Sequence, residues 1–449
     1  MKFDWKRTFF VGLAFFGISA FWQGYDLYVS LTLEGIFGFD NTKRGVVMAL
    51  DNIFALFLLP LFGKLSDRTK SRYGKRTPYI IAGTVVAAVA FIFVAHTSDS
   101  ALRALIAGQD AMPYLPSFIA ALLVALLAMS VYRSPAVALM PDVTPKPLRS
   151  KANAVINLMG GLGGISVMLL GIMFYKETFT RSGSDVAVGP IIPVLSGISG
   201  VMLISLAIFA MFVREPKLVT QMKAESVRYN IAEEEPAGEK QTSKLPRAVL
   251  PSMLLLLSAV FLWFMGYNAV TSSFSVYAKD IWGLEGGNMN LPLLVAHGAA
   301  MVMFIPIGFI ASKIGRKKTI LAGIIIIGAA FGGSFFFRDS FSPLILVFFA
   351  LAGIGWATIN VNSFPMVVEM SRSSSIGVFT GYYYTASMAA QIVTPILSGV
   401  VMDKLGRISL FPYAIVFVAL SFVAMLFVMH GDSKAAMPKD KLELYDVED

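Results

Sequence analysis

The chain has 449 residues, of which 56% are hydrophobic and only 14% are charged. Soluble proteins carry about 25% charged residues, so this composition excludes an ordinary soluble protein and favours one surrounded by lipid. No cysteine is present, which excludes disulfides, thiolate metal ligands and cysteine nucleophiles. The net charge of +9 comes from basic residues that flank apolar stretches. We expect these residues to orient the chain in a membrane, and we expect no nucleic-acid partner.

Twelve apolar stretches are each long enough, at about 20 residues, to cross the ~30 Å hydrocarbon core of a bilayer. The first stretch follows Lys2, Lys6 and Arg7 and continues to about Ser30 without a cleavage site, so we expect a retained helix and no signal peptide. The stretches begin near Thr8, Gly45, Pro78, Ser117, Ala152, Pro190, Leu250, Leu291, Thr319, Pro343, Ile376 and Phe411.

A polar segment separates the first six stretches from the last six. We expect an all-α membrane protein with six-helix bundles at residues 1–213 and 250–430, a linker at 214–249 and a tail at 431–449. Most of the 37 Lys and Arg residues fall in the termini, the linker and alternate loops. The positive-inside rule then predicts that both termini are cytoplasmic. We expect a multi-pass protein of the cell membrane that is a monomer.

The two halves share an internal repeat. The loop after the second stretch contains Gly63, Asp67, Arg68 and Arg76, and the loop after the eighth contains Gly308, Gly315 and Arg316. A glycine lets helices approach closely, and a basic turn anchors a cytoplasmic loop. Inside the stretches, Asp26 corresponds to Asn268 and Arg133 to Asn360. Repeats of this kind place substrate at their interface near the membrane midplane.

The paired loops and the twelve stretches resemble the major facilitator superfamily, in which spans one, four, seven and ten line a central cavity. The segment Ser66–Pro78 is similar, more narrowly, to that of sucrose-proton symporters, and Arg214–Lys217 and Phe264–Tyr267 are similar to the same group and to glycoside-pentoside-hexuronide cation symporters. This resemblance implies secondary active transport by alternating access. The chain departs from both patterns, because span four lacks the expected carboxylate and span two lacks the expected carboxylate pair.

Three ionisable residues fall inside the apolar stretches, where each costs roughly 2.5 to 3.5 kcal/mol on insertion scales. We expect Asp26, helped by Asp51, to bind a coupling proton, and Arg133 to pair with a carboxylate or to hold a substrate hydroxyl. Two structural alternatives stay open: Asp51 could simply bond Asn52, and Arg133 could pair with Asp142.

Neutral polar and aromatic side chains dominate the second half. Sugars need many weak hydrogen bonds and a flat apolar face, and Trp263 and Trp356 offer such faces. Any one of these aromatic residues could instead serve packing alone. The candidate substrate-binding residues are Trp22, Gln23, Tyr25, Arg133, Asn157, Tyr267, Asn268, Trp356, Asn360, Asn362, Tyr383 and Gln391.

The function that we expect is proton-coupled uptake of a disaccharide or small glycoside, with no cofactor. A sodium-coupled symporter and a proton-coupled exporter of amphipathic small molecules remain alternatives. An enzyme is not expected, because the hydrolase and zinc-protease motifs are missing. The three histidines are widely separated, which argues against a metal site. We expect the glycines near Gly160, in span five, to allow close helix packing.

Overall fold

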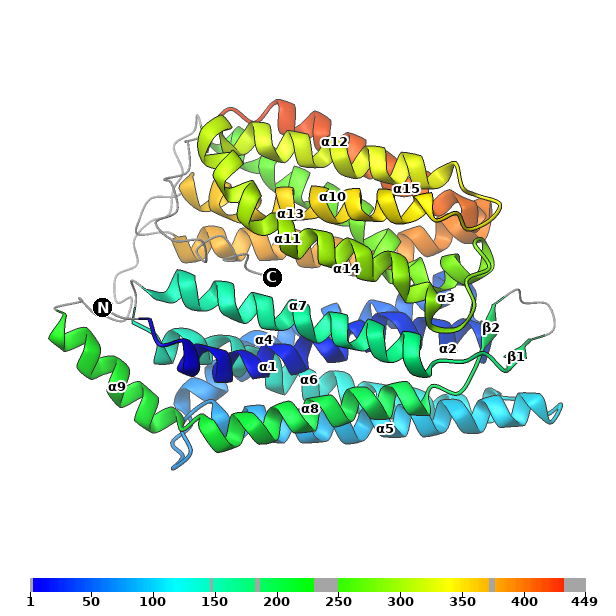
Figure 1. Cartoon of the computed structure of the whole chain (residues 1–449), viewed down its shortest axis with the longest axis horizontal. Helices are drawn as coiled ribbons and strands as arrows, with labels where there is room; N and C mark the ends of the chain where they lie inside the picture. The colour runs from blue at the N-terminus through cyan, green and yellow to red at the C-terminus, as the bar shows by residue number, and fades with distance from the viewer. Residues whose placement is uncertain (1–2, 146–147, 182–185, 230–248, 371–375, 432–449) are drawn as a thin grey trace. The chain divides into compact units, whose positions relative to one another are not determined.

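The structure is a computed structural model that describes residues 3–145, 148–181, 186–229, 249–370 and 376–431. The chain divides into two compact units. The first consists of residues 1–39, 50–233 and 284–290, and the second of residues 40–49, 234–283 and 291–449. Figure 1 shows that long helices build both of them.

The first unit contains most of the N-terminal half. Its long helices are α1 (Trp5–Gly24), α4 (Leu50–Arg68), α5 (Thr77–Ile106), α6 (Leu115–Val143), α7 (Arg149–Phe174) and α8 (Ile192–Phe212). Its shorter elements are the π-helix η1 (Tyr25–Val29), α2 (Ser30–Gly35), the 3-10 helices η2 (Met112–Tyr114) and η4 (Gly286–Asn290), α9 (Glu215–Arg228), and the strands β1 (Phe179–Thr180) and β2 (Ala187–Val188). The strands pair antiparallel, with Phe179 opposite Val188.

The second unit is built from the C-terminal half and one short helix that comes earlier in the chain. Its elements are α3 (Asn41–Met48), α10 (Leu250–Asp280), α11 (Leu291–Ile314), α12 (Arg316–Phe335), α13 (Leu344–Glu369), α14 (Ile376–Leu405), the 3-10 helix η5 (Arg407–Ser409) and α15 (Leu410–Leu426). Proline stands at the start of several helices of both units, where its missing N–H is not needed.

Helix packing confirms the internal repeat. In the first unit α1 packs on α7 and α8, α5 packs on α6 and α8, and α4 packs on α6. In the second unit the equivalent helices make the same contacts: α10 with α14 and α15, α12 with α13 and α15, and α11 with α13. Each half has therefore folded into the same six-helix arrangement.

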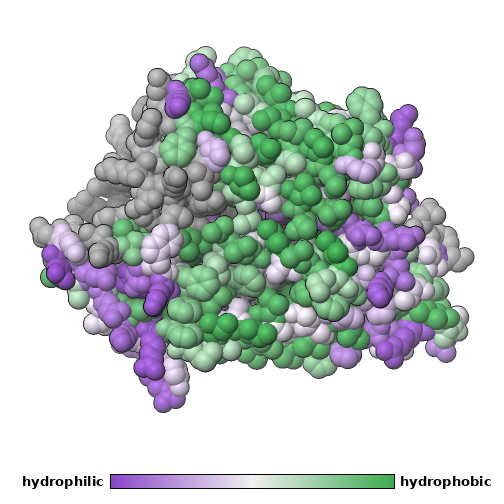
Figure 2. Space-filling view, viewed as in Figure 1, coloured by the Kyte–Doolittle hydropathy of each residue, from purple (hydrophilic) through white to green (hydrophobic). Residues whose placement is uncertain are grey.

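The surfaces of both units are apolar between polar ends. Phe57, Phe93, Ile204, Val302 and Val416 are all more than half exposed, and Figure 2 shows hydrophobic residues across the middle of the visible face with polar residues toward the ends. Within the described residues, eleven helices are long and apolar enough to cross a membrane. Helix α11, at the place of the eighth predicted span, is a further helix of 24 residues. The chain is a multi-pass membrane protein.

Glycine sets the spacing of the α1 and α7 helices, as the sequence predicts. A methyl group on Gly163 would lie 2.2 Å from the Phe16 carbonyl oxygen, and one on Gly160 would lie 2.9 Å from Ser19 Oγ. Small residues let helix backbones approach this closely in membranes. The glycines of span five therefore hold α7 against the helix that leads to Asp26.

One part of the expected organisation is more regular than the sequence predicts. The segment expected as a polar linker starts with helix α9, which places Glu215 and Ser226 in buried positions. Residues 230–248 of the linker and 432–449 of the tail lie outside the described residues.

Candidate functional site

The three ionisable residues predicted for coupling lie together in the first unit. Asp26 stands in η1, the π-helical turn that interrupts span one, and Asp51 stands in the first turn of α4. Their two carboxylates repel each other, and Arg133 of α6 attracts Asp51. All three side chains are half-buried. The structure thus places two acids and one base within electrostatic range of each other.

The contacts of Asp51 and Arg133 distinguish the alternatives that the sequence leaves open. Asn52 Nδ2 donates to Asp51 Oδ1 at 2.9 Å, so the expected structural bond is present, and the carboxylate also repels that of Asp26. Asp142 pairs with Lys75 Nζ at 3.1 Å and with Arg76 Nε at 2.9 Å. Among the described residues, Arg133 makes no hydrogen bond or ion pair, so the static pair with Asp142 is not formed.

An aromatic surface lies in the second unit. The rings of Tyr267 (α10) and Trp356 (α13) stack with centroids 3.8 Å apart and planes 8° apart, and Phe264 meets Trp356 edge-on at 5.1 Å. Next to Tyr267 in the chain, Asn268 Nδ2 is buried without a hydrogen-bond partner among the described residues. A buried donor left unpaired costs about 1–3 kcal/mol. Asn268 is therefore a good candidate for binding a ligand.

The other candidate substrate residues fall into two groups. Tyr25, Asn362 and Tyr383 are almost fully buried, and Tyr383 Oη bonds Ser363 Oγ at 3.0 Å. Trp263 is 1% exposed and also belongs to the packed interior. The partly exposed group consists of Trp22, Gln23, Asn157, Asn360 and Gln391. Within it, Trp22 has a buried Nε1 that finds no hydrogen-bond partner in the described part of the chain.

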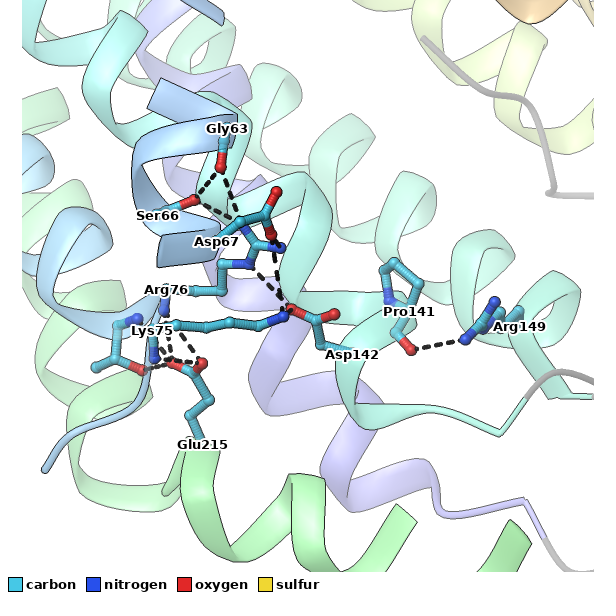
Figure 3. Close-up of polar contacts among 10 residues, drawn as sticks. Gly63, Ser66, Asp67, Lys75, Arg76, Pro141, Asp142, Arg149 and Glu215 are labelled. Atoms are coloured by element: carbon cyan, nitrogen blue, oxygen red, sulfur yellow. Dashed lines mark hydrogen bonds and ion pairs between the residues drawn. The ribbon is translucent and has the colours of Figure 1, made fainter. Parts of the chain in front are cut away.

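The loop that follows α4 is organised around Arg76 (Figure 3). The guanidinium of Arg76 pairs with Asp67 and Asp142, and it donates to Ser66 Oγ and to the Gly63 carbonyl oxygen, the latter at 3.3 Å. A planar guanidinium can serve several acceptors at fixed angles, which an ammonium cannot do. Arg76 thus ties the end of α4 to the end of α6.

Glu215, the first residue of α9, holds the same loop from another side, and sequence reasoning missed it. Its carboxylate accepts hydrogen bonds from the backbone N–H groups of Lys75, Arg76 and Thr77, at 2.8 to 3.1 Å, and from Thr77 Oγ1 at 2.8 Å. Helix α5 begins at Thr77 and lacks a side-chain cap of its own. The first N–H groups of a helix need acceptors and favour negative charge, and Glu215 supplies both.

The corresponding loop of the second half precedes α12. Gly315 has φ +95° and precedes α12, and Arg316 Nη1 donates to the Pro365 carbonyl oxygen at 3.3 Å. Gly308 lies inside α11. Arg68 is exposed, and the described residues provide it with no hydrogen bond or ion pair. Among the predicted loop residues of the first half, Arg76 makes the most extensive contacts to described residues.

Two six-helix units with apolar outer surfaces, each with polar side chains in its interior, define a membrane transporter. A family model described as Major Facilitator Superfamily matches residues 8–395. The chain belongs to this superfamily, whose fold and activity are those of transporters and not of enzymes.

Similarity to individual proteins is weaker. The chain is 28% identical over 140 residues to MFS-type transporter ppzB of Metarhizium majus, which covers 31% of this chain and 30% of that protein. It is 32% identical over 78 residues to sucrose transport protein SUC4 of Arabidopsis thaliana, which covers 17% and 15%. These matches span less than a third of either relative.

Solved structures share the fold over nearly the whole chain. A bacterial homologue of the iron transporter ferroportin matches with a TM-score of 0.67 at 14% identity, covering 95% of this chain and 99% of that one. The xylose transporter XylE of E. coli matches with a TM-score of 0.60 at 14% identity, covering 94% of each chain.

Proposed function

We propose that this transporter takes up a disaccharide or small glycoside together with protons. The observation that supports the proposal is the division of chemistry between the halves. The first unit holds the charged group of Asp26, Asp51 and Arg133, whereas the equivalent positions of Asp26 and Arg133 in the second unit are the neutral Asn268 and Asn360.

The charged group is suited to binding a proton. Two carboxylates and one guanidinium leave one excess negative charge, which a single proton on a carboxylate cancels. An excess charge at this depth is costly, so the protonated and deprotonated forms favour different conformations of the transporter. Arg133 can attract Asp51 when the proton has left, because none of its donors is used by another described residue. Proton binding is thereby linked to the conformational equilibrium.

The second unit is suited to a neutral polyol. Tyr267 covers one face of the Trp356 ring, and Asn268, the next residue along α10, has a side-chain donor without a partner among the described residues. A sugar presents an apolar C–H face and a rim of hydroxyls, which fit a flat ring and amide donors respectively. The name of the Arabidopsis relative, a sucrose transport protein, agrees with this substrate class.

Uptake into proteoliposomes tests the proposal. A panel of radiolabelled disaccharides and glycosides is offered under an inward proton gradient and, separately, under a sodium gradient. We expect accumulation of at least one sugar that depends on the proton gradient. Accumulation under the sodium gradient alone would identify sodium as the coupling ion in place of the proton. Failure of every sugar to enter or to compete would favour an exporter of amphipathic molecules.

Asp26→Asn tests the coupling residue directly. The variant should lose accumulation against a gradient and retain exchange of labelled for unlabelled sugar, because an amide cannot carry the proton but can occupy the same space. Asp110→Asn is the matched control, since Asp110 is exposed and, within the described part of the chain, accepts only from the backbone N of Met112. Full accumulation by Asp26→Asn would contradict the assignment.

A further inference from the structure

The chain that follows α15 is held against the end of the second unit. Residues 427–431, which we call the 427–431 segment, come directly after this helix. Lys317 Nζ of α12 donates to the Val428 carbonyl oxygen at 2.7 Å, and Val428 is fully buried. Gly431 has φ +80°, and a methyl group on it would lie 2.8 Å from the Met366 carbonyl oxygen of α13. Helices α12 and α13 thus fix both the middle and the end of the segment.

A single serine joins the segment to α10. Ser252 stands in the first turn of α10 and is 4% exposed. Its Oγ lies 2.7 Å from His430 Nδ1 and accepts from Met429 N at 3.2 Å. The described residues offer this hydroxyl no other hydrogen-bond partner. Two consecutive residues of the segment therefore depend on one side chain of α10.

These two bonds fix the protonation state of His430. A serine hydroxyl has one hydrogen to donate. Because Ser252 Oγ accepts from Met429 N and meets no other acceptor within the described part of the chain, its hydrogen goes to His430 Nδ1. The ring is then neutral and carries its proton on Nε2. A second proton on the ring would occupy Nδ1 and leave the buried Ser252 hydroxyl without an acceptor.

The charges around the segment also disfavour a protonated ring. The carbonyl groups at the end of α15, which ordinarily attract a cation, are bonded by Lys317, which also donates to the Leu426 carbonyl oxygen at 2.8 Å. Arg316 precedes Lys317 on α12, whereas α13 carries one acid at this end, Glu369, and the start of α10 carries no charge. A positive charge on His430 would therefore be added to an end of the unit that is already basic.

We propose that His430 is a proton-responsive clamp on span seven. The neutral ring ties the 427–431 segment to α10, and the protonated ring releases it. Histidine is the side chain that ordinarily gains a proton between about pH 8 and about pH 5, and His430 is half-buried, so water can deliver that proton. Because α15 packs on α10, release of the segment loosens one end of the helix that carries Tyr267 and Asn268.

The clamp gives the second unit a response to acid on one side of the membrane. The charge pattern predicts that both termini are cytoplasmic. Protons that enter with a substrate would then collect on the side of His430, and the clamp would open in response. This role in transport rests on the proposed proton coupling, whereas the clamp itself does not.

Hydrogen exchange of the backbone amides tests the clamp on the purified full chain. Exchange is measured by mass spectrometry at about pH 7.5 and about pH 5.5, and each rate is divided by the intrinsic rate at that pH. Protection of the 427–431 segment should fall about tenfold at the lower pH, as expected when one buried hydrogen bond is lost. In His430→Asn, the side-chain oxygen stands at the place of Nδ1 and does not titrate. Its protection should therefore be the same at both pH values.

His96→Asn is the matched control. His96 is exposed on α5 of the first unit, and its ring makes no hydrogen bond to a described residue, so this variant should keep the full response to acid. Ser252→Ala removes both bonds to the segment and should lower its protection at both pH values.

Three results would overturn the clamp. One is an equal acid response in His430→Asn and in the unaltered chain, and another is no response in the unaltered chain. The third is a fall of the same size in α8 of the first unit, which would show general loosening by acid. None of these measurements needs a transported sugar, so the clamp can fail while the proposed function stands, and the reverse.

Discussion

Removing the Glu215 carboxylate should destabilise the first unit more than removing any exposed acid. In Glu215→Ala, the backbone N–H groups of Lys75, Arg76 and Thr77 lose their acceptor, and Glu215 is only 1% exposed. Each buried donor left unpaired costs about 1–3 kcal/mol. Since water reaches the vacated space in part, we expect a total loss of about 4 kcal/mol.

The assay is thermal unfolding of the purified protein in detergent. For a unit of this size, about 1 kcal/mol corresponds to roughly 2–4 °C, so Glu215→Ala should lower the apparent melting temperature by about 10 °C. Glu215→Gln keeps one acceptor oxygen and should lower it by about half as much. Asp110→Asn is the matched control in the same unit, because Asp110 is exposed and, within the described residues, accepts only from the backbone N of Met112, at 3.0 Å. Surface substitutions of this kind change stability by no more than about 0.5 kcal/mol. Equal melting temperatures for Glu215→Ala and Asp110→Asn would refute the reasoning.

Three further substitutions give measurable outcomes. Gly163→Ala should lower the apparent melting temperature by several degrees, because its methyl group would lie 2.2 Å from a carbonyl oxygen, whereas Gly200→Ala has open space and should leave it unchanged. Arg76→Lys should also lower the melting temperature by several degrees, since an ammonium cannot serve both acidic partners and two further acceptors at once; an unchanged value would show that charge alone suffices. Trp356→Ala should weaken substrate binding about fivefold, equivalent to about 1 kcal/mol for a lost aromatic contact, measured as the substrate concentration for half-maximal uptake; unaltered affinity would exclude the indole from the site.

Periodic and local features of the sequence predicted the architecture well. The length of the apolar stretches fixes how often the chain crosses the membrane, and the repeat of loop residues around Gly63 and Gly308 predicts two equivalent bundles. The glycines around Gly163 predict a close helix contact because small residues let helix backbones approach each other. The grouping of Asp26 with Asp51 was also predictable, since consecutive antiparallel spans bring the end of one beside the start of the next.

Features that depend on distant backbone groups could not be predicted. Glu215 bonds the backbone of Lys75, 140 residues away in the sequence, and a backbone N–H leaves no trace in residue identity. Asp403 likewise accepts from the backbone N of Asn41, 362 residues away, and the apolar pattern gives no sign of the break between α3 and α4 at Ala49.

The π-helical turn at Tyr25–Val29 distinguishes span one from its counterpart in the second half. A π turn closes i→i+5 bonds where an α turn closes i→i+4 bonds. Helix α10, the equivalent span, runs from Leu250 to Asp280 as an unbroken α-helix, and both spans are 31 residues long. The two spans therefore differ beside Asp26 in the winding of the backbone and not in length, so the equivalent positions of the repeat present their side chains at different angles beyond this turn.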